Sequence, residues 1–294
     1  MKKKYLIITG GAGFIGSNLI EKLISNNKRL QILSIDNYSS GFVKNHISSN
    51  RVKYIKGHTK NFNKIFNKYK NKILSVIHLG EFSRISQSFK NMDECFDSNI
   101  IGTLEVIKFC LNNKIKIIYS ATSATLGDEE NPHRSPYAQS KFNNLNLLIN
   151  LNKWKGLKYS VIYFYNVYGK NQIKNHFMSA VVGIFEKQYE DKKFLTVVRP
   201  GTQSRNFTHV NDTVNCILIA LKDTRNSHYA VYNNKFISIL NLARLFSNKI
   251  KLVKSRPGER FNSKIVNSFR GIKINKYLSK SSIQDYVLRF KSSI

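Results

Sequence analysis

Tyr137 and Lys141 stand four residues apart in the stretch SPYAQSK (135–141), at the start of a helix predicted from Pro136 onward. Residues at i and i+4 share one face of a helix, so the phenol and the ammonium would lie close together. A free phenol titrates at about 10, too high for a base near neutral pH, and an adjacent ammonium favours its phenolate form. The pair could therefore exchange a proton with a substrate hydroxyl. Taken alone, such a pair is equally typical of an exposed helix face.

A glycine-rich turn follows the first predicted strand, in TGGAGFIG (9–16). Gly10, Gly13 and Gly16 are spaced three apart, and an amphipathic helix is predicted from Phe14 onward. Such glycines allow a tight turn and a close approach to a pyrophosphate, which the helix N-terminus then binds. Asp36 stands twenty residues after Gly16, at the end of the second predicted strand. Its carboxylate can accept hydrogen bonds from ribose hydroxyls and would repel a 2′-phosphate, so the sequence predicts NAD rather than NADP.

Short apolar runs alternate with helical patterns through the first half of the chain. The runs predict buried strands at 4–9, 30–35, 52–55, 73–78, 115–120 and 158–163. Apolar residues at i, i+3, i+4 and i+7 predict helices between them, for example at 14–24 and 100–111. Strand, helix and strand in repetition predict a parallel sheet with right-handed crossovers, and hence a doubly wound α/β fold.

This rhythm breaks beyond residue 165. The pattern there predicts helices at 175–190, 211–222, 238–247 and 282–291, strands near 194–198 and 229–232, and a loop at 255–260. The second half is therefore expected to form a smaller, discontinuous unit that packs on the first.

The charge of the chain is strongly positive. Its 294 residues include 48 Lys and Arg against 17 Asp and Glu, a formal net charge of +31. Such a surface attracts nucleic acid or anionic membrane at low salt. The lysines are scattered and usually stand beside asparagines, as in NFNKIFNKYKNK (61–72), with no concentrated basic arm. This pattern favours a coding bias over a nucleic-acid function, so we expect only non-specific binding of nucleic acid.

Three cysteines, Cys95, Cys110 and Cys216, have no Cys-x-x-Cys spacing, which predicts reduced thiols and no zinc site. The start of the chain, MKKKYLIITGG, has too few apolar residues before its glycines for a signal peptide and predicts a first strand. No run approaches the roughly 20 apolar residues that a membrane-spanning helix needs. We therefore expect a cytoplasmic protein with neither a membrane segment nor a metal site.

Eight motifs give the chain a resemblance to a known family. They are TGGAGFIGSNL, DNYSSG, HLGEFSR, NIIGTLEV, SPYAQSK, FYNVYG, RNFTHVND and RPGE, in this order along nearly the whole chain. In these motifs the chain resembles the extended short-chain dehydrogenase/reductase superfamily, and within it the NAD-dependent nucleotide-sugar epimerase/dehydratase family. The resemblance implies a Rossmann-type doubly wound sheet over 1–165, with a returning segment at 205–233 that completes the NAD-binding domain. It also implies a smaller nucleotide-sugar substrate domain made of 166–204 and 234–294.

The resemblance implies roles for three catalytic residues. The Thr122 hydroxyl would bind the substrate oxygen, Tyr137 would take or give its proton, and Lys141 would also bind the nicotinamide ribose. A register counted from a Ser-Ala-Thr triplet selects Ser123 instead of Thr122, but Gly127 then falls out of step with the family pattern. Both registers place the hydroxyl on the loop after the fifth predicted strand.

Binding residues also follow from the resemblance. The expected cofactor-binding residues are Gly10, Gly13, Phe14, Ile15, Gly16, Asp36, Asn37, His58, Thr59, Leu79, Gly80, Ser120, Tyr137, Lys141 and Phe164. The expected substrate-binding residues are Ser83, Arg84, Asn166, Arg205 and Arg256. The chain departs from the family pattern at three positions, where His58 replaces an acidic residue, Tyr163 an arginine and Leu126 a tyrosine. His78, at the end of the fourth predicted strand, is expected to be structural.

The two residues after Thr122 bear on the reaction. Dehydratases of the family have Asp-Glu there and decarboxylases a glutamate, whereas this chain has Ser123 and Ala124. Neither residue can act as the acid or base that elimination of water requires. The sequence therefore predicts an epimerase, resembling the UDP-glucose and UDP-N-acetylglucosamine 4-epimerases.

Other functions stay open from the sequence. HLGEFS is also reminiscent of nucleotide-heptose 6-epimerases, and a nucleotide-sugar reductase or a dehydratase are further alternatives. A function of another class would be NAD(H) sensing or RNA binding without catalysis, although a pure sensor would not need Thr122, Tyr137 and Lys141 together. The resemblance also implies a homodimer through helices at 99–112 and 137–151, and a place in polysaccharide biosynthesis.

Overall fold

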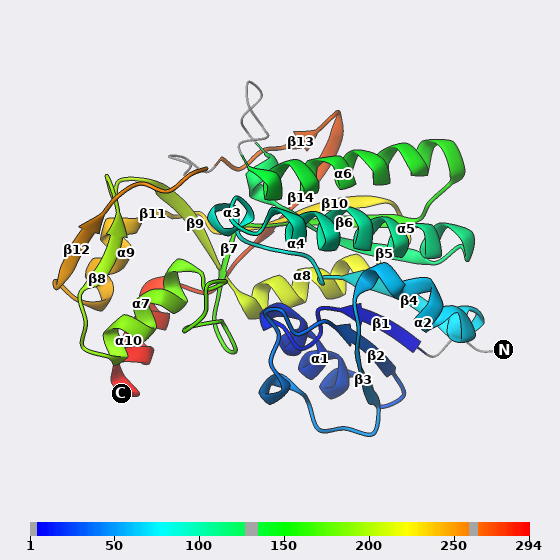
Figure 1. Cartoon of the computed structure of the whole chain (residues 1–294), viewed down its shortest axis with the longest axis horizontal. Helices are drawn as coiled ribbons and strands as arrows, with labels where there is room; N and C mark the ends of the chain where they lie inside the picture. The colour runs from blue at the N-terminus through cyan, green and yellow to red at the C-terminus, as the bar shows by residue number, and fades with distance from the viewer. Residues whose placement is uncertain (1–4, 127–134, 259–263) are drawn as a thin grey trace.

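A nine-stranded sheet forms the centre of the larger of two lobes (Figure 1). The computed structural model describes residues 5–126, 135–258 and 264–294, and all nine strands lie in these ranges. Their order from edge to edge is β13 (Ser268–Phe269), β14 (Ile272–Leu278), β10 (Ser227–Tyr232), β6 (Tyr159–Phe164), β5 (Lys116–Thr122), β4 (Ile73–His78), β1 (Tyr5–Thr9), β2 (Gln31–Asp36) and β3 (Val52–Lys56). Neighbouring strands are parallel except β13 and β14. The predicted doubly wound α/β fold is confirmed.

The central strands are apolar on both faces because helices cover both. Ile7 of β1 pairs with Leu33 of β2 and Val76 of β4, and all three side chains are almost completely buried. The prediction of burial on both faces is wrong for β3, whose residues are partly or fully exposed. This strand forms the edge of the sheet, and its two lysines are suited to an edge that must not pair with another chain.

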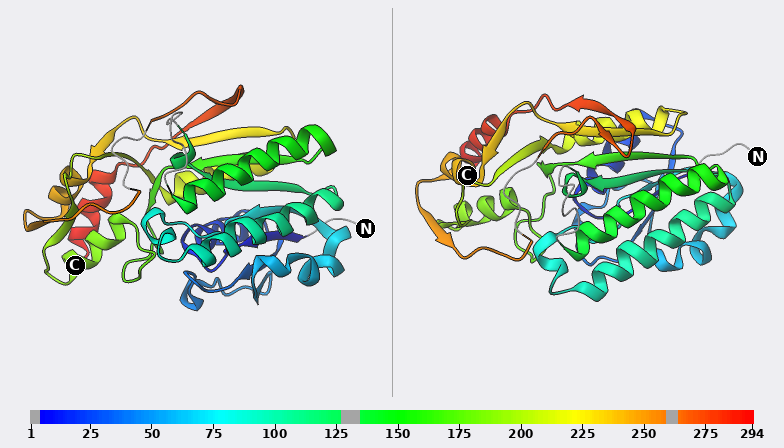
Figure 2. Two further views of the ribbon diagram at one scale, coloured as in Figure 1. Left: turned by 45° about the horizontal axis from the view of Figure 1, so that its top comes forward. Right: turned by 90° about the horizontal axis from the view of Figure 1, so that it is seen from above.

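Helices pack on the two faces of the sheet in separate layers (Figure 2). One face carries α1 (Phe14–Asn26) and α8 (Val210–Lys222). The other carries α2 (Phe62–Phe66), α4 (Met92–Phe96), α5 (Thr103–Asn112) and α6 (Pro136–Lys155). The helix predicted at 100–111 starts at Thr103, because a π-helical stretch at Asp97–Gly102 precedes it. Within the described ranges, no helix has the length and hydropathy that crossing a membrane requires.

The smaller lobe packs around its own apolar core, which includes Tyr168, Phe185 and Phe246. Its strands are β7 (Asn166–Tyr168), β9 (Ser204–His209) and β11 (Phe236–Ser238) in one sheet, and β8 (Leu195–Val198) and β12 (Ile250–Val253) in another. Its helices are α7 (Val181–Glu190), α9 (Ile239–Phe246) and α10 (Ile283–Ser292). Figure 1 shows this lobe beyond the ends of the central strands.

Three sequence predictions for the second half need correction. The helix predicted at 175–190 begins only at Val181, after turns in which the His176 N–H donates to Ser179 Oγ at 3.1 Å. The predicted returning segment at 205–233 reaches the large sheet only after β9, which belongs to the smaller lobe. Residues 268–278, assigned with 234–294 to the smaller unit, join the large sheet because β14 pairs with β10. Most of β14 is exposed, so its sequence lacks the apolar run that reveals a strand.

Candidate active site

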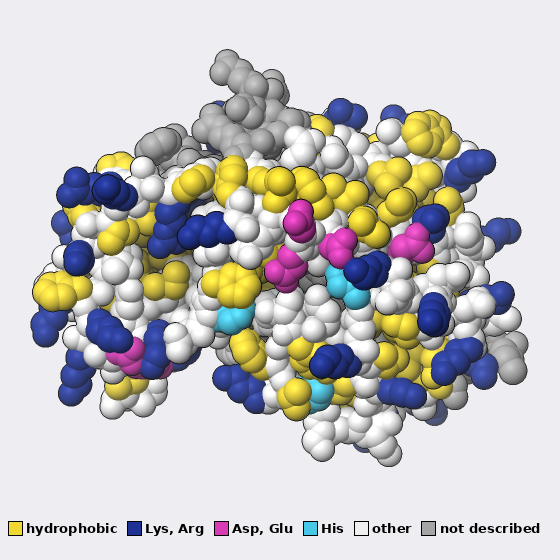
Figure 3. All heavy atoms as spheres, viewed as in Figure 1, with side chains coloured by type: hydrophobic (Ala, Val, Ile, Leu, Met, Phe, Trp, Pro, Cys, Tyr) yellow, Lys and Arg dark blue, Asp and Glu magenta, His cyan; other side chains and the backbone are white. Residues whose placement is uncertain are grey.

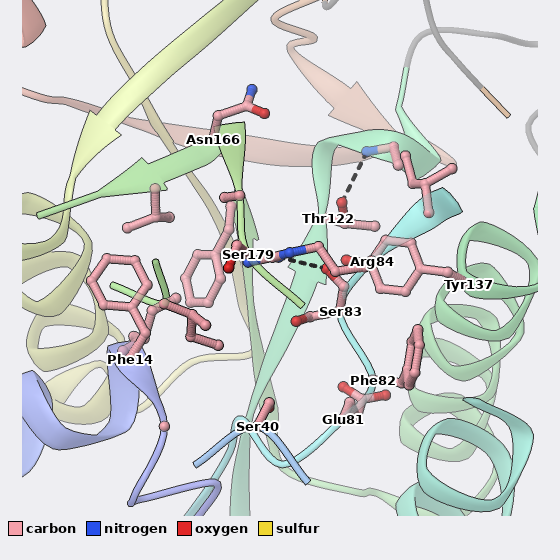
Figure 4. A pocket seen from close by; sticks show the side chains of 18 of the residues that line it. Phe14, Ser40, Glu81, Phe82, Ser83, Arg84, Thr122, Tyr137, Asn166 and Ser179 are labelled. Atoms are coloured by element: carbon pink, nitrogen blue, oxygen red, sulfur yellow. Dashed lines mark hydrogen bonds between the residues drawn. The ribbon is translucent and has the colours of Figure 1, made fainter. Parts of the chain in front are cut away.

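A cavity of about 430 Å³ opens at the carboxyl ends of the central strands and is lined by both lobes (Figure 4). This edge is where ligands bind in doubly wound sheets. The cavity is lined by the predicted cofactor residues Gly10, Gly13, Phe14, Ile15, Gly16, Asp36, Asn37, Leu79, Gly80, Ser120 and Phe164, the predicted substrate residues Ser83, Arg84, Asn166, Arg205 and Arg256, and the predicted catalytic residues Thr122, Tyr137 and Lys141. The fold thus brings together segments far apart in the sequence.

The glycine-rich turn between β1 and α1 is packed too closely for side chains. Gly10 has a φ of +71°, and a Cβ there would lie 2.9 Å from the backbone of Leu79 and Gly80. A Cβ on Gly16 would lie 2.2 Å from the Gly10 carbonyl oxygen. Gly13 precedes α1, where no side chain caps the first N–H groups. Those groups therefore face the cavity as donors for a phosphate, and the turn fits a dinucleotide.

Asp36 is held beside this turn by two backbone groups. Its Oδ2 accepts from the Ala12 N–H at 2.9 Å and its Oδ1 from the Tyr38 N–H at 2.8 Å. Burial raises the pKa of Asp36, while these hydrogen bonds to the charged form oppose the increase. The carboxylate lines the cavity at the end of β2. Its position suits hydrogen bonds to the adenosine ribose of a dinucleotide, as the sequence predicted.

The predicted helix with Tyr137 and Lys141 on one face is confirmed as α6. It starts at Pro136, and the Ser135 hydroxyl caps it by accepting from the Ala138 N–H at 3.1 Å. Tyr137 is 8% exposed and Lys141 4%, so the pair does not lie on an exposed helix face. Both side chains line the cavity. Their burial rules out the alternative that the sequence left open, an exposed helix face without a function.

Thr122 ends β5 next to the start of α6. Its Oγ1 accepts from the Ala124 N–H at 3.1 Å and caps the short helical turn Ser123–Thr125. Figure 4 shows Thr122 and Tyr137 directed into the same part of the cavity. Ser123 also lines the cavity, so both registers for the catalytic hydroxyl stay compatible with the geometry. Gly127, on which the choice of register depended, lies outside the described residues.

The cavity lining includes three arginines and is rich in positive charge. Arg84, Arg205 and Arg256 line it together with Asn166, whose Nδ2 donates to the Asn206 carbonyl at 3.0 Å. Guanidinium groups from separate loops are suited to the oxygens of a diphosphate. Arg205 and Arg256, the two arginines that the sequence predicted to hold a nucleotide diphosphate, therefore both line the cavity.

His58 and Thr59, predicted to bind the cofactor, do not line the cavity. The His58 Nδ1 accepts from the Lys60 N–H at 3.1 Å, and its Nε2 lies 3.3 Å from Ser98 Oγ. Thr59 is buried against Gly102, where a Cβ would lie 2.1 Å from Thr59 Oγ1. Ser98 itself lines the cavity. A contact between the cofactor and His58 or Thr59 therefore has no support in the geometry.

His78 is completely buried and structural, in agreement with its prediction. Its Nδ1 lies 2.7 Å from Thr9 Oγ1 and its Nε2 2.8 Å from Thr103 Oγ1. Burial lowers the pKa of His78 to about 4, so the ring is neutral near pH 7. It joins β1, β4 and α5 beneath the cavity.

Glu81 is a cavity residue that was not among those predicted from the sequence. This residue lines the cavity, and its carboxylate forms an ion pair with Lys141 in which the two side chains are only 1% and 5% exposed. The motif HLGEFSR contained the signal, since a carboxylate follows a strand that ends at the ligand-binding edge of the sheet. Among the described residues, no group of three or more His, Cys, Asp or Glu side chains is arranged to hold a metal ion.

Comparisons with known proteins agree with this geometry. The model of the NAD dependent epimerase/dehydratase family matches residues 6–233. A putative UDP-glucose 4-epimerase of Methanocaldococcus jannaschii is 28% identical over 74% of this chain and 73% of its own length. UDP-glucuronic acid decarboxylase 6 of Arabidopsis thaliana is 26% identical over 86% of this chain and 78% of its own. The solved UDP-N-acetylglucosamine 4-epimerase of Methanobrevibacter ruminantium, in complex with UDP-N-acetylmuramic acid, is 27% identical with a TM-score of 0.82 and covers both chains completely.

Proposed function

The chain belongs to the NAD dependent epimerase/dehydratase family, and from this premise we propose that it is a nucleotide-sugar epimerase of the UDP-hexose 4-epimerase type. The glycine turn and Asp36 line the cavity and fit NAD, because a turn without side chains lets a pyrophosphate approach the backbone. When bound, NAD accepts a hydride from the sugar and returns it. The residues of the chain then have to move one proton and hold the sugar.

Tyr137 and Thr122 carry the proton chemistry in this proposal. Tyr137 removes the proton of a sugar hydroxyl as its carbon is oxidised, and Thr122 hydrogen-bonds the same oxygen. The resulting keto sugar rotates in the cavity, so that the opposite face of its carbonyl carbon is turned toward the cofactor. Tyr137 then returns the proton to the carbonyl oxygen as that carbon is reduced. Lys141, on the same helix face, would donate a hydrogen bond to the nicotinamide ribose. Arg205 and Arg256 would clamp the diphosphate while the sugar turns.

The carboxylates around the cavity are the observation that carries the choice of an epimerase. Among the described residues, Asp36 and Glu81 are the acidic residues that line it. Asp36 is tied to the glycine turn and Glu81 to Lys141. Neither is free to protonate a leaving hydroxyl or to deprotonate a sugar carbon, as a dehydratase requires. Epimerisation needs no further acid or base, and the hydroxyls of Tyr137 and Thr122 suffice for it.

The proposed substrate is a UDP-hexose that reacts at C4. Two of the relatives named above are called 4-epimerases of UDP-sugars, which supports C4 of a UDP-hexose as the reacting centre. The third is a UDP-glucuronic acid decarboxylase, so UDP is common to all three names while the reaction is not. A direct assay of the reaction is therefore needed.

We expect the purified protein, incubated with UDP-, GDP-, ADP- and dTDP-sugars, to invert C4 of a UDP-hexose without net consumption of NADH. NMR of the products reads the stereochemistry of each carbon. Loss of water or of CO₂ would identify a dehydratase or a decarboxylase, net NADH consumption a reductase, and inversion at C6 of a heptose the related epimerase. Inertness toward all sugars with tight RNA binding at physiological salt would favour a binding protein.

A homodimer in the cytoplasm, serving polysaccharide biosynthesis, completes the proposal. Ile101 and Leu104 are 49% and 39% exposed next to and within α5. Figure 3, viewed as Figure 1, shows apolar side chains across the face that carries α5 and α6. Such a face is suited to a symmetric contact with a second copy. We expect sedimentation at micromolar concentration to give a dimer, and a monomer alone would remove this part of the proposal.

A further inference from the structure

The side chain of Glu81 is buried, and both of its carboxylate oxygens accept hydrogen bonds. Its Oε2 accepts from the Lys141 ammonium. Its Oε1 accepts from the Tyr119 hydroxyl at 3.1 Å, the Thr103 hydroxyl at 3.0 Å and the Asn144 side-chain amide at 3.1 Å. Four donors from β5, α5 and α6 therefore surround one carboxylate, which is the arrangement that keeps a buried carboxylate charged.

Lys141 is correspondingly restricted. Besides Glu81, its ammonium donates to the Ser120 carbonyl at 2.6 Å and lies 4.9 Å from the centre of the Tyr119 ring. An ammonium has three N–H donors, so two are used within the protein and one is left for the cavity. Lys141 can thus offer a single directed hydrogen bond, while its positive charge is matched by the adjacent carboxylate.

Glu81 and Lys141 form the ion pair at the centre of this cluster. Burial lowers the pKa of His78 to about 4, and His78 contacts the cluster through Thr103 as a neutral ring. Burial raises the pKa of Cys95, on α4, to about 11 and that of Tyr119 well above 10, so both keep their protons. The ion pair therefore has no further charge among its described neighbours.

Arg84 differs from Lys141 in having no carboxylate partner among the residues that the structure describes. Its Nε donates to the Met178 carbonyl at 2.6 Å and its Nη1 to the Ser83 carbonyl at 2.7 Å. Figure 4 shows the Tyr137 ring directed toward this side chain. Burial lowers the pKa of Arg84, and the proximity of Tyr137 opposes this decrease. The cavity lining thus contains a lysine that is paired with a carboxylate and an arginine for which the described residues supply no carboxylate.

We propose that Glu81 is a positioning residue whose carboxylate fixes the Lys141 ammonium and cancels its charge. Lys141 then acts as a hydrogen-bond donor, and the cation beside Tyr137 that no carboxylate of the described residues pairs is Arg84. This inference rests on the proposed function, in which Lys141 lies at the nicotinamide ribose. It predicts an effect on the cofactor itself, because oxidised NAD has a positively charged ring and NADH does not. An unpaired ammonium would repel only the oxidised form.

The test is the ratio of the dissociation constants of NAD⁺ and NADH in the apoprotein, measured by calorimetry and by NADH fluorescence. We expect Glu81→Gln to weaken NAD⁺ relative to NADH by about tenfold, since a net positive charge is created near the ring. Glu105→Gln is the matched control, because Glu105 pairs with Lys108 at 2.8 Å on the surface. The control is expected to leave the ratio unchanged.

Two further variants guard against a simple loss of folding. Lys141→Met leaves the carboxylate unpaired and should strengthen the binding of NAD⁺ relative to that of NADH. The double variant Glu81→Gln with Lys141→Met should return the ratio of the two dissociation constants toward the wild-type value. An equal weakening of both forms in Glu81→Gln would mean a purely structural role and overturn the inference. If the wild-type protein binds neither form, it is the proposed function that fails instead.

Discussion

Replacing Tyr137 by phenylalanine is expected to lower turnover by about a hundredfold or more, while the protein still folds and binds NAD. The substitution removes only the phenol oxygen, and the ring keeps its apolar neighbours Phe82, Ala138 and Met178. Loss of a general base or acid lowers rates by about a hundredfold to ten-thousandfold. Epimerisation of the preferred sugar measures the first effect, and the absorbance of NAD(H) released on denaturation measures the second.

Tyr69→Phe provides the control for Tyr137→Phe. Tyr69 packs edge-on against Tyr5, with ring centres 5.4 Å apart, at the opposite end of β1 from the glycine turn. The same atom is removed there without any contact with the cavity, so activity should stay near the wild-type value. Unchanged turnover in Tyr137→Phe would refute the mechanism, because no step of it proceeds without that hydroxyl.

The parts of the site that follow from local chemistry were predictable from the sequence. The spacing of Gly10, Gly13 and Gly16 requires a turn without side chains, and the structure has Cβ positions there that would collide with backbone. The i, i+4 spacing of Tyr137 and Lys141 needed only the helix that Ser135 and Pro136 begin. Each of these features depends on a few neighbouring residues.

The parts that depend on distant contacts were not predictable. The environment of Glu81 is formed by Lys141, sixty residues away in the sequence, and by donors on three different elements. The membership of β14 in the large sheet depends on its pairing with β10 and not on an apolar run of its own. Contacts of this kind leave no periodic pattern in a sequence.

Gly10→Ala, in the glycine turn, is expected to destabilise the fold and to prevent NAD binding. Gly10 has a φ of +71°, which costs a non-glycine residue roughly 1–3 kcal/mol. The added Cβ would in addition lie 2.9 Å from backbone atoms of Leu79 and Gly80, which cannot rotate away. We expect a total loss of about 3 kcal/mol or more in the free energy of unfolding.

Gly156 separates the backbone effect from the contact effect. It ends α6 with a φ of +69°, nearly the value at Gly10, but a Cβ there meets nothing within 4 Å. Gly156→Ala should therefore cost only about 1 kcal/mol, with NAD binding intact. Chemical denaturation of both variants, with titration of NAD into each, gives the comparison. Equal destabilisation and equal NAD affinity in the two would mean that the close approach of the turn to Leu79 and Gly80 has no part in forming the cofactor site.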